Sequence, residues 1–167
     1  MDRKRSSSKL YKNLAITAGI VIVLCIGIFA VKQGLGNGKS ISALQGDLII
    51  PKSEITENAQ FYPVNLDGRN MEIIAVRAGD GTIRTAFNTC QVCNGSPKAY
   101  YKQEGDMLVC QNCGNKFSMD MVEEQRGGCN PVPIYKENKR DDGSGIVISK
   151  EFIEQNKSLF TSNWKTK

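Results

Sequence analysis

Histidine is absent from this chain of 167 residues. Its absence excludes zinc fingers with two histidine ligands, iron–sulfur clusters held partly by histidine, haem bound through an imidazole, and a catalytic cysteine activated by a histidine base. Any metal that this chain binds must therefore be held by sulfur or oxygen ligands.

Beyond residue 13, the chain also lacks a marked excess of basic over acidic residues. Lysine and arginine number 22 against 17 acidic residues, but residues 1–13 alone hold five basic residues and one acidic residue. The rest of the chain, with 17 basic and 16 acidic residues, is close to neutral. We therefore expect no nucleic-acid partner, and we interpret the basic tail as a signal for membrane orientation.

One apolar stretch stands apart from the rest of the sequence. Residues 14–31 are 18 consecutive uncharged residues, and a helix of this length nearly spans the hydrocarbon layer of about 30 Å. We predict a single transmembrane helix in the cell membrane, with the basic tail of residues 1–13 in the cytoplasm and the main domain outside. Cys25 is then an ordinary apolar residue in the bilayer.

The sequence after the predicted anchor divides into a linker and one domain. Residues 32–42 contain three glycines among polar residues and show no apolar periodicity, which predicts a flexible linker. Residues 43–167 then form an extracytoplasmic, cysteine-rich metal-binding domain, long enough to bury a modest core.

Short apolar runs broken by turn residues predict that this domain is mainly β. We expect a small antiparallel sheet or partial barrel with two Cys-x-x-Cys knuckles, and a short C-terminal helix that covers one face. The expected elements are strands at 61–65, 71–77, 82–88, 99–101, 107–109, 132–135 and 145–148, and a helix at 150–160 with Ser149 as its N-cap.

Five cysteines in the second half of the chain are its strongest chemical signal. Their spacing is Cys90-x2-Cys93-x16-Cys110-x2-Cys113-x15-Cys129, and two Cys-x-x-Cys pairs at such a separation are typical of a metal site. Each pair follows a predicted strand and presents two thiolates from one turn, so two facing turns can close a tetrahedral sulfur cage. The paired cysteines are the candidate ligands of a metal or cofactor.

Spacing alone leaves three kinds of site open. A structural zinc ribbon, an iron–sulfur or mononuclear iron site, and metal-free thiol–disulfide chemistry all use paired cysteines. Free thiols outside the cytoplasm tend to form disulfides, and metal ligation is one reason for them to remain thiolates. Thioredoxin-like chemistry fits less well, because its cysteine pair opens a helix and neither pair here precedes a helical pattern.

Glycine and asparagine residues accompany the cysteines. Asn94-Gly95 and Gly114-Asn115 accept positive φ, which leaves backbone N–H groups free to point at sulfur. In the segment Gly127-Gly128-Cys129-Asn130-Pro131, the two glycines permit close approach of the backbone and the proline stiffens the exit. Cys129 is a fifth candidate metal ligand, a residue that shields a cluster, a disulfide partner, or a small buried residue in a tight turn.

With these motifs, the sequence resembles the family of membrane iron–sulfur proteins described as FtrD-like, predicted bacterial membrane proteins found near iron-uptake permeases. The likeness covers about residues 47–148 and the predicted anchor. It rests on Asp80-Gly81-Thr82-Ile83-Arg84, Ala86-Phe87, the two cysteine pairs, Gly105-Asp106, Val109, Gly114, Phe117 and the segment from Gly127 to Pro131. The resemblance implies an iron–sulfur cofactor and a role near an iron permease.

The same stretch is similar in layout to a Rieske domain, with a strand into one ligand loop, a hairpin into a second, and a loop with glycine and proline. It departs at the ligands, because cysteine stands where Rieske proteins have histidine. Such a departure implies a low-potential all-cysteine cluster or a zinc-filled descendant of that fold.

Export bears on the choice of metal. A protein that carries a preassembled cluster is usually exported folded by the twin-arginine route, and Arg3-Lys4-Arg5 lacks the adjacent arginine pair. Unfolded export followed by metal loading outside favours zinc or mononuclear iron.

From the sequence we predict a membrane-anchored iron–sulfur or metal-binding protein that serves in electron transfer or iron handling for an iron-uptake system. The expected partners are the membrane and an iron permease or redox protein. The alternatives are a non-catalytic zinc-ribbon binding module and an exported thiol–disulfide protein. No acid–base pair of carboxylates is evident, and we do not expect an enzyme.

Overall fold

The computed structural model describes residues 41–165. The predicted cytoplasmic tail, transmembrane helix and Cys25 lie outside the described residues, as does most of the predicted linker. Within residues 41–165, no helix is long and apolar enough to cross a membrane.

The largest sheet has five strands in the order β1-β3-β4-β5-β9. Its strands are β1 (Ser42–Ala43), β3 (Gln60–Leu66), β4 (Arg69–Arg77), β5 (Ile83–Cys90) and β9 (Pro131–Pro133). Strands β3, β4 and β5 are consecutive and antiparallel, which confirms the predicted meander, whereas β1 lies parallel to β3. The β3–β4 turn places Asp67 at φ 49° and Gly68 at φ 78°, as a tight hairpin turn of the type I′ class requires.

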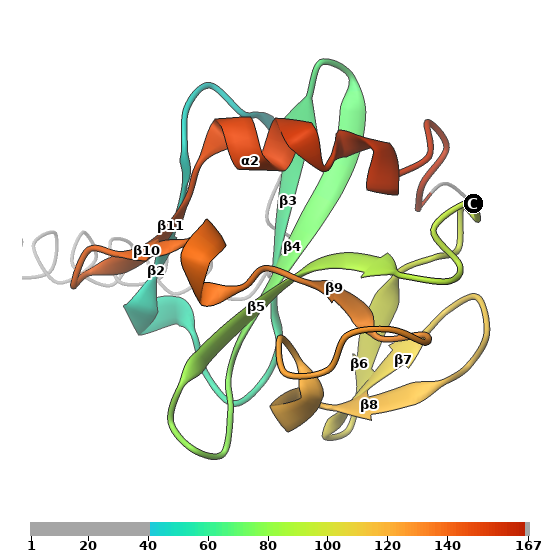
Figure 1. The fold of residues 1–167 in the computed structure, drawn as a ribbon, viewed down its shortest axis with the longest axis horizontal. Coiled ribbons are helices and arrows are strands. Elements are labelled where there is room, and N and C mark those ends of the chain that lie inside the picture. The colour runs from blue at the N-terminus through green and yellow to red at the C-terminus, as the bar shows by residue number, and fades with distance from the viewer. Residues whose placement is uncertain (1–40, 166–167) are drawn as a thin grey trace, which may run out of the picture. The chain divides into compact units, whose positions relative to one another are not determined.

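Two further sheets of three strands each complete the domain (Figure 1). One joins β10 (Arg140–Asp141), β11 (Gly145–Ile148) and β2 (Leu48–Pro51). The other, which we call the cysteine hairpin sheet, joins β6 (Tyr101–Glu104), β7 (Met107–Cys110) and β8 (Lys116–Ser118). Four short 3-10 helices connect these elements: Lys52–Glu54, Met119–Met121, Lys136–Asn138 and Lys157–Leu159.

The expected small antiparallel sheet or partial barrel is therefore confirmed in part. The domain is mainly β, but its strands form three small sheets and residues 41–165 contain no closed barrel. The difference arises because β4 is buried on both faces. Ile73 and Ala75 contribute to one hydrophobic cluster, and the alternate residues Ile74 and Val76 contribute to the other, as the period of two in a strand requires.

The two clusters place the smaller sheets on opposite faces of the large one. The first cluster includes Ile50 from β2, Ile146 from β11 and Ile153 from the C-terminal helix. The second includes Tyr101, Leu108 and Phe117 from the three strands of the cysteine hairpin sheet. Because the hairpin sheet packs through this second cluster, its cysteines are held beside the end of β5.

The C-terminal helix begins where the sequence predicts. Helix α2 spans Lys150–Gln155, and the Oγ of Ser149 accepts a hydrogen bond of 3.2 Å from the backbone N–H of Phe152. The helix ends earlier than expected, because the side chain of Asn156 donates to the Phe152 carbonyl at 2.8 Å and the chain continues as a 3-10 turn. The four apolar residues that the sequence assigned to its buried face all contact the first cluster: Phe152, Ile153, Leu159 and Phe160.

Candidate metal centre

Both cysteine pairs lie at strand ends, as predicted. Cys90 is the last residue of β5 and Cys110 is the last residue of β7. These two are buried, at 0% and 1% exposure, because they also belong to the second hydrophobic cluster. Their partners are more open: Cys93 is partly buried and Cys113 is exposed. Each pair thus has an inner thiol on the sheet and an outer thiol at the surface.

The fold brings all five predicted site cysteines together. The sulfur atoms of Cys90, Cys93 and Cys129 lie within 4.8 Å of one another, and so do those of Cys93, Cys110 and Cys113. The two groups share Cys93 and, among the described residues, do not merge into one group of four. All five are free thiols in this structure. Cys129 therefore lies within the cluster of thiols rather than apart from it.

Backbone N–H groups point at the inner thiol of the first pair. The N–H of Cys93 donates to Cys90 Sγ at 3.3 Å. Burial raises the pKa of Cys90, but the N–H groups of Cys93 and Val92 and the Tyr101 hydroxyl outweigh it and leave that pKa lowered. Burial raises the pKa of Cys93 to about 11. Cys90 is therefore the more easily deprotonated thiol of the first pair.

In the second pair, the outer thiol is the one whose pKa is lowered. Burial raises the pKa of the inner Cys110 to about 11. The pKa of the outer Cys113 is lowered, because a hydrogen bond from the backbone of Asn115 and contacts with neighbouring thiols outweigh its own desolvation. A bound cation deprotonates coordinating thiols outright, and in each pair one thiol, Cys90 or Cys113, loses its proton more readily than its partner.

Two consecutive glycines shape the third cysteine loop, residues 127–130. Gly127 has φ 95° and Gly128 has φ 60°, and a Cβ added at either would meet no atom within 4 Å. The glycines are thus required by backbone conformation, and the expected close approach is not the reason for them. A hydrogen bond with Cys113 contributes most to raising the pKa of Cys129 to about 11.

Hydrogen bonds tie the three cysteine loops to one another. Between the first loop (residues 90–97) and the third, the N–H of Gly127 donates to Gln91 Oε1 at 3.1 Å, and the N–H of Gln91 donates to the Asn130 carbonyl at 3.2 Å. Between the first and the second (residues 110–115), Ser96 Oγ donates to Asn112 Oδ1 at 2.7 Å. The thiols are therefore held by a cross-linked frame.

Sequence reasoning missed the central role of Tyr101. This residue is 1% exposed, and its hydroxyl donates to the carbonyl of Cys129 and contacts the thiol of Cys90. Burial, followed by that thiol, raises the pKa of the phenol above its ordinary value. The backbone N–H of Tyr101 donates to Asn88 Oδ1 at 2.7 Å. In the sequence, the only signal of this role was the position of Tyr101 at the start of the hairpin that leads to the second cysteine pair.

Trp164, which had no predicted role, supports the exit of the first loop. Its indole N–H donates to the Ala99 carbonyl at 3.1 Å, and its ring packs edge-on against Tyr100 at 6.0 Å between centroids. The next residue, Lys165, donates its backbone N–H to the Pro97 carbonyl at 2.8 Å. The C-terminal segment thus fixes a loop that lies more than sixty residues earlier in the chain.

We expected residues with positive φ after both cysteine pairs, and the structure has a glycine with positive φ after the second pair only. Gly114 has φ 75°, but Gly95 is not among the residues with positive φ. Replacing Gly114 by alanine is therefore expected to destabilise the domain by about 1–2 kcal/mol, the cost of a left-handed backbone for a residue with a Cβ. Chemical denaturation of the full chain measures this difference.

Gly95→Ala is the matched control, because a Cβ at either glycine meets no atom within 4 Å. We expect Gly95→Ala to leave the free energy of unfolding unchanged or to raise it slightly through a stiffer unfolded chain. Equal destabilisation by the two variants would contradict the assignment of strain to Gly114 alone.

The donor set suits a thiophilic metal or cluster. Sulfur-only ligation by cysteine is typical of zinc and of iron–sulfur centres, and the site combines sulfur ligands with backbone N–H donors aimed at Cys90. A bound metal or iron–sulfur cluster would be held by the paired cysteines, with Cys129 beside them.

Comparison with protein families agrees with this chemistry. Residues 55–160 match the model of the family described as "Membrane iron-sulfur containing protein FtrD-like". Comparisons with curated proteins and with solved structures gave no match. The matched span contains all five clustered cysteines and most of the three sheets. The chain therefore belongs to the FtrD-like family of membrane iron–sulfur proteins, which indicates a metal- or iron-associated function.

Proposed function

We propose that this protein is a membrane-anchored iron–sulfur protein that transfers electrons for an iron-uptake system, with the cluster held by Cys90, Cys93, Cys110 and Cys113. The observation that carries the proposal is the arrangement of the five sulfur atoms in two groups that share Cys93. Membership of the FtrD-like family supports the choice of iron. The membrane anchor and an iron permease or redox partner are parts of the proposal that follow from the predicted topology and the resemblance.

The sulfur geometry places five thiols within reach of one centre. Cys90, Cys93 and Cys129 lie within 4.8 Å of one another, and so do Cys93, Cys110 and Cys113. A single structural zinc ion takes four ligands, so the site holds one thiol more than zinc needs. The choice of iron rests on this fifth thiol and on the family.

The burial of the site suits electron transfer. When bound, an iron–sulfur cluster supplies a reversible one-electron couple whose potential depends on hydrogen bonds to sulfur and on exposure to solvent. The strand-end cysteines Cys90 and Cys110 are buried, whereas Cys113 is exposed. The outer thiolate offers a short route from the cluster to a partner at the surface. The loops around it are cross-linked, which keeps structural change on reduction small.

Metal analysis of the full chain tests the proposal. We expect protein purified without oxygen to contain iron and acid-labile sulfide, to absorb in the visible range, and to bleach on reduction. Stoichiometric zinc without a chromophore would reject electron transfer and support a structural zinc module. Metal-free protein with titrating disulfides would instead support the thiol–disulfide alternative.

Replacing Cys129 by serine tests whether the fifth thiol is a ligand. Because Cys129 lies within 4.8 Å of Cys90 and Cys93, we expect Cys129→Ser to lower the iron content and to shift the visible absorption bands. Cys25→Ser is the control, since Cys25 is predicted to lie in the membrane and outside the site. An unchanged iron content and spectrum for Cys129→Ser would remove Cys129 from the ligand set.

A further inference from the structure

We propose that the three cysteine loops form a docking face for a redox protein with an acidic binding surface. The proposal rests on the electron-transfer function above and names the kind of partner that this function requires. It combines exposed basic residues at the edge of the face with a centre that has no charged side chain besides the cysteine thiolates.

Apart from the cysteine thiolates, the centre of the face carries no charged group. Residues 90–97, 110–115 and 127–135 contain no lysine, arginine, aspartate or glutamate. At its surface lie the outer thiol of Cys113 and the side chain of Val92, which is 66% exposed and is one of three large exposed apolar residues in the described chain. A centre with few charged side chains suits the core of a protein interface.

Basic residues border each cysteine loop. Lys98 follows the first loop, Lys116 follows the second, and Arg126 precedes the third. All three are exposed, and none forms an ion pair with another residue in the range 41–165. The N–H of Gly127 bonds to Gln91 in the first loop, so Arg126 lies beside two of the loops. These three basic residues, which border the thiolates, match a partner with acidic residues around its own redox centre.

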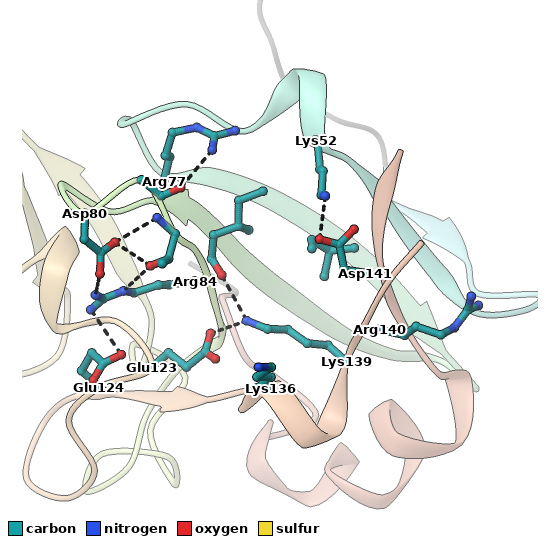
Figure 2. Close-up of a pocket in the computed structure, with 14 residues that line it drawn as sticks. Lys52, Arg77, Asp80, Arg84, Glu123, Glu124, Lys136, Lys139, Arg140 and Asp141 are labelled. Carbon is teal, nitrogen blue, oxygen red and sulfur yellow. Dashed lines mark hydrogen bonds and ion pairs between the residues drawn. The ribbon is translucent and has the colours of Figure 1, made fainter. Parts of the chain in front are cut away.

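Of the acidic residues nearest the third loop, Glu123 is engaged elsewhere. It pairs with Lys139, and Figure 2 shows its carboxylate directed at this cation in a separate cleft of about 850 Å³. Glu124 lies 3.7 Å from the Arg84 guanidinium, which also pairs with Asp80 at 2.6 Å. Arg84 therefore offsets part of the charge of Glu124, and Glu123 subtracts little from the positive potential of the docking face.

A recess lies beside the docking face. A cleft of about 520 Å³ is lined in part by Gln91 and Asn94 of the first loop, by Arg126, and by Glu137 and Asn138. A protruding acidic side chain of a partner can enter this recess and reach Arg126. The amides that line it can accept or donate hydrogen bonds without a charge of their own.

The composition of the face favours a protein partner over a lipid surface. Interfacial membrane binding uses several large apolar residues such as tryptophan, phenylalanine or leucine beside basic ones. Here the loop tips carry amides and glycines, and Val92 is their only large exposed apolar residue within the described chain.

Binding of the full chain to an acidic flavodoxin tests the proposal. We expect calorimetry in a neutral detergent to show binding at an ionic strength of about 0.01 M and its loss at about 1 M, where charges are screened. The double variant Lys116→Glu/Arg126→Glu is expected to weaken binding about tenfold or more at low ionic strength. Val92→Ser is expected to weaken binding at low ionic strength.

The matched control is Arg140→Glu/Lys150→Glu, which makes the same change of charge at an exposed and a partly exposed residue. Arg140 lies in β10 and Lys150 begins α2, both far from the cysteine hairpin sheet in Figure 1. We expect this variant to bind like the wild type. Equal weakening by both double variants, the absence of binding by the wild type, or tighter binding to phosphatidylglycerol vesicles than to flavodoxin would overturn the proposal.

Calorimetry detects binding whichever metal the site holds. A zinc-loaded protein that passes this test would therefore reject the electron-transfer function while retaining the docking face. An iron–sulfur protein that fails it would retain the function and lose the docking face.

Discussion

Replacing Cys110 by serine is expected to abolish metal binding and to destabilise the cysteine hairpin sheet. Thiolate metal sites contribute apparent binding free energies of about 10 kcal/mol or more, and this energy stabilises the fold to which the metal binds. Cys110 is 1% exposed and ends β7 within the second hydrophobic cluster. Loss of the ligand therefore removes the largest single source of stability at this end of the domain.

The substitution also harms the metal-free protein. A serine hydroxyl in place of the buried thiol adds a polar group with a desolvation cost of about 1–3 kcal/mol unless it is hydrogen-bonded. Metal content by elemental analysis and amide hydrogen exchange of residues 101–118 measure the two effects. We expect exchange to accelerate in β6, β7 and β8 before it does in β3 and β4.

Cys113→Ser separates the two contributions, because Cys113 is exposed. We expect this variant to lose the metal as well, while its metal-free form is as stable as metal-free wild type. If Cys110→Ser retained stoichiometric metal, or if the two serine variants had equal stability without metal, the division into inner and outer thiols would be wrong.

Replacing Lys139 by methionine is expected to destabilise the protein by about 3–5 kcal/mol, the cost of leaving one partner of a buried ion pair uncompensated. The side chains of Lys139 and Glu123 are only 8% and 13% exposed. The Lys139 ammonium also donates to Thr85 Oγ1 at 3.0 Å and to the Ile83 carbonyl at 3.3 Å. Figure 2 shows this ammonium between the Glu123 carboxylate and β5.

Glu123 itself occupies a costly backbone conformation. Its φ is 69°, which is unfavourable for a residue with a Cβ, and its carboxylate accepts the backbone N–H of Thr85 at 2.9 Å. The ion pair with Lys139 helps to hold this conformation four residues before the third cysteine loop. We therefore expect Lys139→Met to loosen that loop as well as to lower the free energy of unfolding.

Thermal and chemical denaturation measure this prediction, with Lys52→Met as the control. Lys52 pairs with Asp141 at 2.6 Å, but the two side chains are 31% and 53% exposed, and such surface pairs contribute about 1 kcal/mol or less. A loss below about 1 kcal/mol for Lys139→Met would show that the pair is solvated in solution and does not anchor the loop.

Local patterns predicted much of the fold. The meander of β3, β4 and β5, the turn at Asp67-Gly68 and the cap at Ser149 depend on neighbouring residues and on strand or helix periodicity. These features were expected correctly because their energies are local. The position of each cysteine pair at a strand end was correct for the same reason.

Long-range pairing was not predictable in this way. Strand β2 pairs with β11 almost one hundred residues later, as in the register Ile50 opposite Ile146. Both segments are short and apolar, and nothing in either sequence names its partner. The burial of β4 on both faces likewise depends on which sheets pack against it.

By itself, the sequence determined the kind of centre that this protein can have. Without histidine, and with two Cys-x-x-Cys pairs at strand ends, the chain can build a sulfur-ligated site and few others. Ligand type is a property of residue identity and spacing, and both are visible without a structure.

Only the tertiary structure decided where Cys129 lies. Its place within 4.8 Å of Cys90 and Cys93 depends on packing of the hairpin sheet against β5, on two glycines with positive φ, and on the bond from Tyr101 to its carbonyl. These contacts join residues far apart in the chain, and closing such loops costs entropy that only the assembled core can offset. For that reason the fifth thiol remained ambiguous in the sequence and became part of the site in the fold.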